Sequence, residues 1–414
     1  MLIDLLAAAS GSFDVEAATR AYLDTLQGPA RAQSDAYFEG GYWLILWGTL
    51  VGVLVDWLLL NLRMMAKFRD LGERFFKRAF GVTWLTALLY TLAGALITLP
   101  WTIYTDFFRE KQFGLLDQGF GAWFGEQATA LAIGLVIMPL LFAVIYWVIR
   151  KSPRWWWLWS TGVVGAYLLF MMMIAPVFLA PLFNTYTEME AGPLRDRIVA
   201  MAQEHDVPAT KVYVFDQSKQ HKRISANVSG IGPTIRIALN DNLLERTGED
   251  EVVAVMGHEL GHYKLNHGPK RVLKTLLVFG LGLFLASRIA PWLIARFGKR
   301  WGVRELADPA SMAVLSIVLS VFFMAATPAF NNITRMQENE ADAFGLDASR
   351  EPDGFAKVSM RLSEYRKLEP GTLEEFLFFT HPSGENRVRR SMQWKADNVA
   401  NPQIETPPEG YLDN

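Results

Sequence analysis

The sequence contains no cysteine among its 414 residues. This absence excludes a disulfide framework and a cysteine-ligated metal, so any metal ion must be bound by His, Asp or Glu. Histidine is also scarce, with six residues in the whole chain. Three of them, His258, His262 and His267, lie close together in the sequence, and this segment is therefore the first place to look for a metal site.

A large charge of one sign is missing as well. The formal net charge is -2, so the chain lacks the basic field that attracts phosphate backbones, and we expect no nucleic-acid partner. No Lys or Arg precedes the short apolar run at residues 1–10, and Asp4 interrupts it, which argues against a signal peptide. Hydrophobic residues nevertheless make up 51% of the chain, which favours a membrane protein.

Six apolar segments are long enough to cross the hydrocarbon core of a bilayer. They comprise residues 42–62, 81–104, 128–149, 155–177, 272–297 and 310–330. We therefore expect a multi-pass α-helical membrane protein with about six transmembrane helices and a mainly α-helical soluble domain. The expected parts are an N-terminal amphipathic lead (1–40), four transmembrane helices (41–183), the first part of the soluble domain (184–270), two transmembrane helices (271–330), and its second part with the C-terminal tail (331–414).

The first part of the soluble domain combines helical and extended patterns. Apolar spacing predicts a helix at residues 192–205. Residues 211–215, 223–229 and 234–239 are rich in β-branched residues and are separated by Gly and Pro, which predicts a small antiparallel β-sheet. Thr247 is expected to open the next helix, which carries the histidine cluster.

The segment His258-Glu259-Leu260-Gly261-His262 places two histidines four residues apart on that helix. Such histidines share one helical face and can bind the same tetrahedral ion. A zinc ion with three protein ligands keeps its fourth position for water, and Glu259 is placed to accept a proton from it. We therefore expect one zinc ion and metal-assisted amide hydrolysis. A helical rotation of about 140° takes His267 off this face, and we expect it to be a surface or structural histidine.

The third zinc ligand must be a carboxylate or another histidine. Glu338 and Asp342 share one face of an expected helix, so Glu338 is a candidate ligand and Asp342 a candidate acceptor for the second ring N–H of a ligand histidine. A solvated acidic face is the alternative interpretation. His381 could donate a hydrogen bond to an oxyanion, or it could be an ordinary loop histidine.

Several further segments are similar to those of the type I CAAX prenyl proteases, which are integral-membrane zinc endopeptidases of the gluzincin group. Besides the metal motif, the similar segments are Leu99-Pro100-Trp101 with residues 107–114, Ala175-Pro176 with residues 180–184, residues 338–344, and Thr380-His381-Pro382 with Arg387. The resemblance covers roughly residues 40–395.

This resemblance implies roles for individual residues and a setting for them. The implied zinc ligands are His258, His262 and Glu338, with Glu259 as the general base and Asp342 as support. The implied roles of His381 and Arg387 are an oxyanion donor and a supporting charge near the ligand carboxylate or the substrate. The implied substrate strand is Ser225, Ala226, Asn227 and Val228, whose backbone would pair with an extended peptide; an ordinary buried strand is the alternative. The helices are expected to form a chamber.

Orientation in the membrane is the one point on which two arguments conflict. Loops near residues 63–78, 150–154 and 296–304 hold thirteen Lys or Arg, whereas the loop near Arg109 and Lys111 holds two. The positive-inside rule would then turn the catalytic domain outward. The resemblance implies an active site that faces the cytosol, in a bacterial inner membrane or an endoplasmic reticulum, and we expect this orientation.

The expected substrate is a peptide or protein, lipidated near its C-terminus or otherwise associated with membrane lipids. A broad-specificity quality-control protease for membrane proteins is the alternative within enzymes. A non-catalytic zinc-binding receptor or transporter is disfavoured, because a structural zinc site does not need the Glu259 carboxylate. The sequence does not indicate an oligomeric state.

Overall fold

The computed structural model describes residues 13–230, 235–408 and 410–412. The apolar run at residues 1–10 and Thr234 lie outside this part of the chain. The helices are α2 (Val15–Leu23), α3 (Gly28–Asn61), α4 (Met64–Phe75), α5 (Ala79–Thr102), α6 (Arg109–Gln112), α7 (Phe120–Lys151), α8 (Trp156–Ile174), α9 (Pro193–Glu204), α10 (Asp241–Arg246), α11 (Glu249–Lys264), α12 (His267–Trp301), α13 (Met312–Ser349), α14 (Pro352–Leu362), α15 (Thr372–Phe378) and α16 (Gly384–Asn398). The strands are β1 (Tyr186–Glu188), β2 (Val212–Phe215), β3 (Ala226–Ser229) and β4 (Arg236–Asn240).

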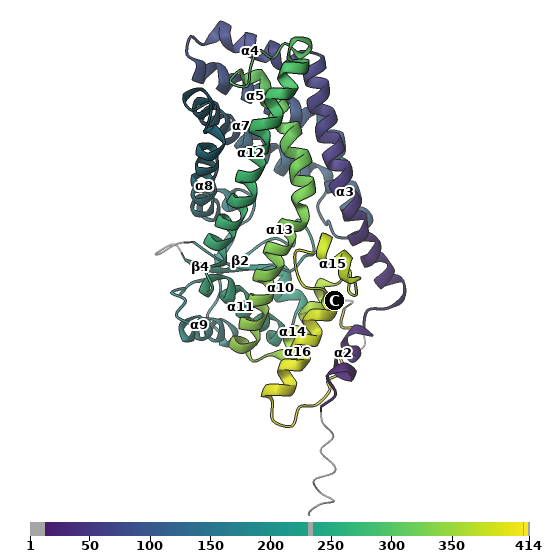
Figure 1. Cartoon of the computed structure of the whole chain (residues 1–414). Coiled ribbons are helices and arrows are strands. Elements are labelled where there is room, and N and C mark those ends of the chain that lie inside the picture. Colours follow the sequence, from purple (N-terminus) through teal and green to yellow (C-terminus); the bar gives the residue numbers. More distant parts are fainter. Residues whose placement is uncertain (1–12, 231–234, 409, 413–414) are drawn as a thin grey trace, which may run out of the picture.

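Six helical segments in the described part of the chain are long and apolar enough to cross a membrane, which confirms the expected number. They are Gly28–Asn61, Ala79–Gln112, Phe120–Lys151, Trp156–Leu182, His267–Trp301 and Pro309–Ser349. The long helices form one elongated bundle in Figure 1, with the short α4 at its upper end, and the sheet lies at its lower end together with α9, α10, α11, α14 and α16. The fold is therefore a membrane-helix bundle with a mainly helical domain attached to one end.

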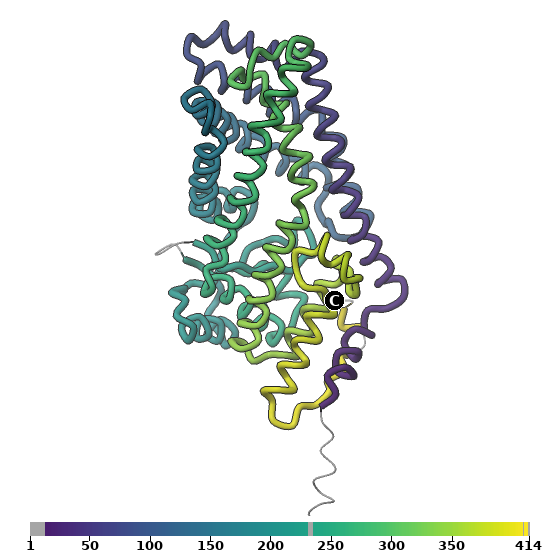
Figure 2. Tube along the Cα trace, viewed as in Figure 1, coloured from purple at the N-terminus to yellow at the C-terminus, as the bar shows by residue number. Residues whose placement is uncertain are grey.

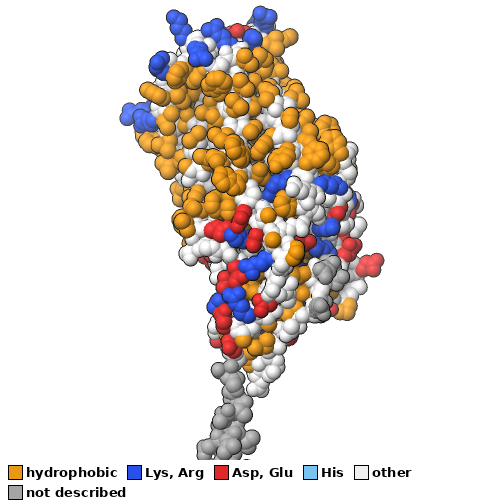
Figure 3. Space-filling model, turned by 90° about the vertical axis from the view of Figure 1, so that its right-hand side faces the viewer, with side chains coloured by type: hydrophobic (Ala, Val, Ile, Leu, Met, Phe, Trp, Pro, Cys, Tyr) orange, Lys and Arg blue, Asp and Glu red, His pale blue; other side chains and the backbone are white. Residues whose placement is uncertain are grey.

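A wide apolar surface surrounds the bundle. Figure 3 shows an orange band of hydrophobic side chains with a cluster of Lys and Arg at one end and the mixed charges of the protease domain at the other. Large apolar side chains such as Trp43, Val136 and Leu277 are more than half exposed in this region. A water-soluble protein rarely leaves so large a patch uncovered, and contact with lipid tails explains it.

The last spanning helix connects the bundle directly to the functional region. Helix α13 runs without a break through Pro328, so its second half carries Glu338 and Asp342 out of the apolar bundle. Helix α12 likewise starts at His267, directly after the metal motif. The helical hairpin that separates the two parts of the soluble domain thus also aligns them.

The small sheet is mixed, and the prediction of an antiparallel sheet was wrong. Its strand order is β1-β2-β4-β3. Strand β2 pairs with β4 in parallel, whereas β1 and β3 pair antiparallel with their neighbours. The pair β3 and β4 joins the sheet through β4, so β3 becomes an edge strand. Residue alternation gives no information on strand direction, and the three-residue strand β1 was too short to predict.

The protease domain is held together by helices from both of its parts. The helix expected at residues 192–205 is observed as α9, whose Ile198 and Met201 pack in one core with Val252, Met256 and Leu260 of α11. Helices α14 and α16 cover the other side of α11 and α13, with Ala254, Leu346 and Phe355 in a second cluster.

Helix α2 of the N-terminal lead packs on this domain. Tyr22 of α2 is fully buried and donates a hydrogen bond of 2.8 Å to Asp353. Figure 2 shows the purple N-terminal helix beside the yellow C-terminal helix α16. The first spanning helix then begins at Gly28, earlier than the apolar run alone indicated, because polar residues such as Ser34 and Glu39 continue the helix towards the domain.

Candidate metal centre

Helices α11 and α13 cross closely because glycines lie at their contact. A Cβ atom on Gly257 would lie 2.7 Å from the carbonyl oxygen of Gly345, and one on Gly345 would lie 2.8 Å from the amide nitrogen of His258. Gly261 similarly contacts Ala341 and Phe344. This close approach brings the carboxylates of α13 beside the histidines of α11.

Three predicted ligands meet at this crossing. The Nε2 atoms of His258 and His262 lie 3.1 Å apart, and Oε2 of Glu338 lies 3.2 Å and 3.4 Å from them. One potential ligand atom from each side chain falls within 4.8 Å of the others. Two imidazoles and one carboxylate whose ligand atoms converge on one point can bind a tetrahedral Zn²⁺ and leave one coordination position open. The residues therefore fit the metal that the motif predicts.

The start of α11 differs in detail from the prediction. The helix is capped by Gly248, not by Thr247, and the backbone N–H of Gly248 donates a 2.8 Å hydrogen bond to the Glu251 carboxylate. Glu251 is itself held by Arg361 at 2.7 Å. A carboxylate in the first turn stabilises the helix through its dipole, and α14 fixes this end of it.

Asp342 lies where the sequence predicted it. Its Oδ1 is 2.8 Å from Nδ1 of His258 and thus orients the ring so that Nε2 faces Glu338. Burial opposes a charge on His258, but the hydrogen bonds to Asp342 and Glu338 outweigh this and raise the pKa of His258 to about 9. The site therefore favours positive charge.

Arg387 contacts Asp342 rather than the ligand carboxylate. Its Nε donates to Oδ2 of Asp342 at 3.0 Å, and its Nη2 donates to Oδ1. Both side chains are buried, so the guanidinium compensates a charge that would otherwise be costly in the domain interior. Arg387 also lines the cavity beside His258 and Glu259, so it lies near the expected substrate position while its direct contact is with Asp342.

His267 is not a surface histidine. Helix α11 ends at Lys264, and Asn266 adopts a left-handed conformation with φ of 56° before α12 begins. This break turns His267 back towards α11, so the rotation expected for a continuous helix does not apply. Its ring is 1% exposed, and its Nδ1 lies 2.9 Å from Nδ1 of His262. The other ring nitrogen lies 2.9 Å from the carboxylate of Glu340.

Glu259 faces a cavity beside the ligand pair. The cavity has a volume of about 180 Å³, and its lining includes His258, Glu259, His381 and Arg387. Burial raises the pKa of the Glu259 carboxyl, while the neighbouring histidines act in the opposite direction. A carboxylate with a raised pKa in a cleft is suited to proton transfer.

His381 approaches the same point from the loop after α15. Its Nε2 lies 3.4 Å from Oε2 of Glu338. Burial and the nearby charge of Arg366 lower the pKa of His381 well below its usual value, so the ring is neutral at pH 7. The Thr380 hydroxyl lies 2.9 Å from Nδ1 and can donate to it, which leaves the proton on Nε2, directed at the site.

The predicted substrate strand lies at the open edge of the sheet. Ser225 and Ala226 line the cavity with His258 and Glu259. The backbone N–H and C=O of Ser225 both bond to Asn240, whereas the outer edge of β3 pairs with no strand among the described residues. Val228 packs against the protease core. The residue at the cavity that sequence reasoning missed is Arg366, because a single Arg in the charged loop between α14 and α15 has no distinguishing pattern.

Comparison with known families agrees with this geometry. The model for peptidase family M48 matches residues 188–395, half of the chain. The chain belongs to peptidase family M48. A second model, described as the CAAX prenyl protease N-terminal domain with five membrane helices, matches residues 24–185, where the structure has four candidate spans. The chain is therefore a multi-pass membrane metallopeptidase, as the sequence predicted.

Relatives and a solved structure support the same assignment. The uncharacterized metalloprotease YhfN of Bacillus subtilis is 25% identical, over 82% of this chain and 81% of that protein. CAAX prenyl protease 1 homologs of Oryza sativa and Homo sapiens are 30% and 26% identical; the matches cover 63% and 66% of this chain and 62% and 65% of those proteins. The crystal structure of S. mikatae Ste24p matches with a TM-score of 0.73 and 19% identity over 89% of this chain and 90% of that one, which confirms the fold.

Proposed function

We propose that the chain is a zinc-dependent endopeptidase that hydrolyses peptide bonds near the C-terminus of lipidated or membrane-associated peptides. The proposal rests on one observation: the potential ligand atoms of His258, His262 and Glu338 lie close together, beside Glu259. These three side chains would hold one Zn²⁺. When bound, zinc supplies Lewis acidity and lowers the pKa of water towards about 7.

The protein's own groups then carry the proton transfers. Glu259 accepts a proton from the attacking water and delivers it to the leaving amine. His381, neutral and protonated on Nε2, donates a hydrogen bond to the oxyanion that develops on the carbonyl. Asp342 and Arg387 hold the His258 ring in place, so that the ligand set is organised before the substrate binds.

The substrate would enter as an extended strand along β3. Its outer edge offers backbone groups for pairing, and Ser225, Ala226, Asn227 and Val228 supply that edge. The domain sits at one end of the membrane bundle (Figure 1), which suits a peptide tethered to the bilayer. The similarity to CAAX prenyl protease 1 homologs of a plant and of human supports a lipidated C-terminal substrate.

Cleavage of a farnesylated CAAX peptide beside its unlipidated twin tests both parts of the proposal. We expect faster cleavage of the farnesylated peptide, and a loss of about 10²- to 10⁴-fold in kcat for Glu259→Gln. Glu249→Gln is the matched control, because Glu249 is exposed in the first turn of the same helix. Undiminished turnover by Glu259→Gln would refute the mechanism, and equal cleavage of the two peptides would favour the broad-specificity alternative.

We also propose that the active site faces the cytosol. The resemblance supports this orientation, while the Lys and Arg at the opposite end of the bundle (Figure 3) support the reverse. Because the chain has no native cysteine, single substitutions report the side directly. In intact cells, an impermeant maleimide should label Arg154→Cys, near that basic end, and not Gln403→Cys, in the tail of the protease domain. The opposite labelling would place the protease domain outside.

A further inference from the structure

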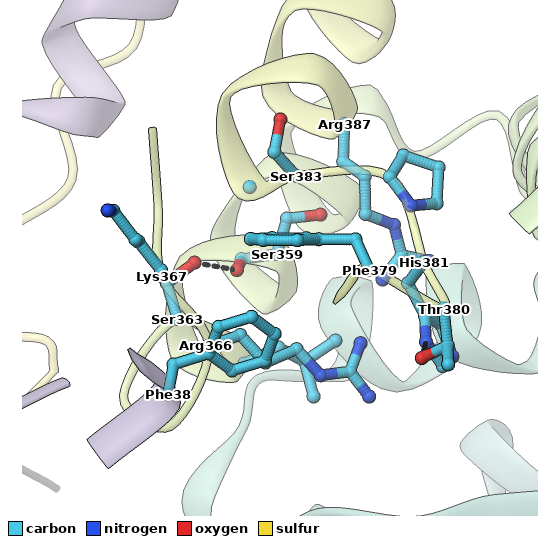
Figure 4. Close-up of a pocket in the computed structure, with 13 residues that line it drawn as sticks. Phe38, Ser359, Ser363, Arg366, Lys367, Phe379, Thr380, His381, Ser383 and Arg387 are labelled. Carbon is cyan, nitrogen blue, oxygen red and sulfur yellow. Dashed lines mark hydrogen bonds between the residues drawn. The ribbon is translucent and has the colours of Figure 1, made fainter. Parts of the chain in front are cut away.

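Arg366 lies between the metal centre and a second, smaller cavity. It lines the cavity of about 180 Å³ that contains His258 and Glu259, and also an adjoining cavity of about 30 Å³. Figure 4 shows its side chain extended along the cavity, with the guanidinium directed towards the loop of Thr380 and His381. Arg366 therefore presents a positive charge to whatever occupies the space beside the catalytic groups.

The guanidinium of Arg366 has no hydrogen bond or ion pair with any residue that the structure describes. Its one ring contact is with Tyr365, whose ring centroid lies 5.9 Å from the guanidinium carbon of Arg366. The other two basic side chains that line these cavities are both paired: Arg387 with Asp342, and Lys367 with Glu39 and Glu374. Arg366 is thus the exception among them.

The direction of the pKa shift of Arg366 agrees with this lack of a partner. Burial lowers the pKa of Arg366. For Arg387, burial acts in the same direction, but the charge of Asp342 outweighs it and raises the pKa. Arg366 is partly buried, and a guanidinium that has lost part of its hydration without gaining a carboxylate is costly, so binding an anion would offset that cost.

The shape of the small cavity indicates which anion fits. Its volume of about 30 Å³ holds about two water molecules, and aromatic side chains of Phe38 and Phe379 form part of its wall. A polypeptide cannot continue through such a space, whereas a chain can end at its mouth. A carboxylate also matches the planar fork of an Arg, which can donate two parallel hydrogen bonds to it.

We propose that Arg366 binds the C-terminal carboxylate of the substrate peptide and thereby sets the distance between the scissile bond and the chain end. This inference rests on the proposed function and adds a substrate-binding residue to it. The carboxylate would be anchored beside Arg366 while the scissile carbonyl lies near Glu259 and His381. Specificity for bonds close to a free C-terminus follows from this arrangement.

The test compares two peptides that differ only at the C-terminus, one a free acid and one an amide. We expect the wild type to cleave the free acid with a kcat/KM about tenfold to a hundredfold higher, the range for a hydrogen bond to a charged group. Arg366→Gln should cleave both peptides at the low rate of the amide. Lys367→Met is the matched control and should keep the wild-type ratio, because Lys367 lines the small cavity but is already paired.

Three outcomes would overturn the inference. The wild type could cleave acid and amide equally, or Arg366→Gln could keep the wild-type ratio. A third peptide, an amide with Glu as its last residue, could be cleaved as well as the free acid, which would assign Arg366 to an acidic side chain instead. Zinc content and the Arg366→Lys variant, which should retain part of the preference, show whether a loss comes from misfolding. A failure of the proposed function would be seen in a different experiment, because the Glu259→Gln variant would then keep its turnover.

Discussion

At the scale of single residues, the two ligand histidines are oriented by different routes. His258 contacts the Asp342 carboxylate directly, whereas His262 reaches the Glu340 carboxylate through His267. With Nε2 of His262 directed at the metal, its Nδ1 carries the proton and donates to His267. His267 must then carry its own proton on Nε2, which donates to Glu340. Only one set of tautomers satisfies all three side chains.

This chain of hydrogen bonds predicts that His267 supports metal binding. His267→Leu should weaken zinc affinity about tenfold to a hundredfold, because the N–H of His262 loses its acceptor. His267→Asn should lose less, since its side-chain oxygen can still accept from His262. Competition against a chromophoric zinc chelator measures the affinities, and a Leu variant that binds zinc as tightly as the wild type would contradict the prediction.

The sequence was sufficient to select candidate ligands that the fold brings together, but not to describe their surroundings. His258, Glu259 and His262 follow from helical spacing, and Glu338 and Asp342 share a face four residues apart. The contact of His267 with His262 does not follow from helical spacing, because α11 ends before Asn266 and the chain turns there. Arg366 and the Arg387–Asp342 pair depend on contacts between segments far apart in the sequence, which no local pattern specifies.

At the scale of elements, the crossing of α11 and α13 determines the site. Glycines at 257, 261 and 345 allow the helix backbones to approach so closely that Glu338 reaches both histidines. The long helices and their apolar faces were predictable from periodicity. The crossing was not, because the same glycines inside a helix would also be compatible with flexibility or a kink.

The crossing predicts a specific effect of Gly345→Ala. The added methyl group would lie 2.8 Å from the His258 amide nitrogen, so the helices must separate, at a cost of about 1–3 kcal/mol in the free energy of unfolding. Zinc affinity should fall with it. Gly162→Ala is the control, since no atom lies within 4 Å of the added methyl group. Thermal unfolding and zinc titration in detergent measure both effects, and equal behaviour of the two variants would contradict the role of the crossing.

At the scale of the whole molecule, the metal site connects two parts of the chain that the α12–α13 hairpin separates. His258 and His262 precede the hairpin, and Glu338 lies in its second helix. A bound ion would therefore stabilise the packing of both parts, by an amount that grows with its concentration relative to its dissociation constant.

Removal of the metal should consequently lower both activity and thermal stability. With zinc at about a hundred times its dissociation constant, the loss of stability would be about 2.7 kcal/mol. Scanning calorimetry or fluorescence before and after chelation measures it, and added Zn²⁺ should restore both properties. Glu259→Gln provides the control: chelation should lower its melting temperature as it does for the wild type, although the variant has little activity to lose. An unchanged melting temperature on chelation would show that the ion does not join the two parts.

The interruption of the ligand set by two membrane-spanning helices also has a consequence during biosynthesis. A nascent chain that has left the ribosome only as far as His262 carries two of the three ligands and lacks Glu338, Asp342, His381 and Arg387. These residues reach the histidines only after the hairpin has entered the bilayer and α13 has packed on α11. Hydrolytic activity would thus begin only with correct membrane integration.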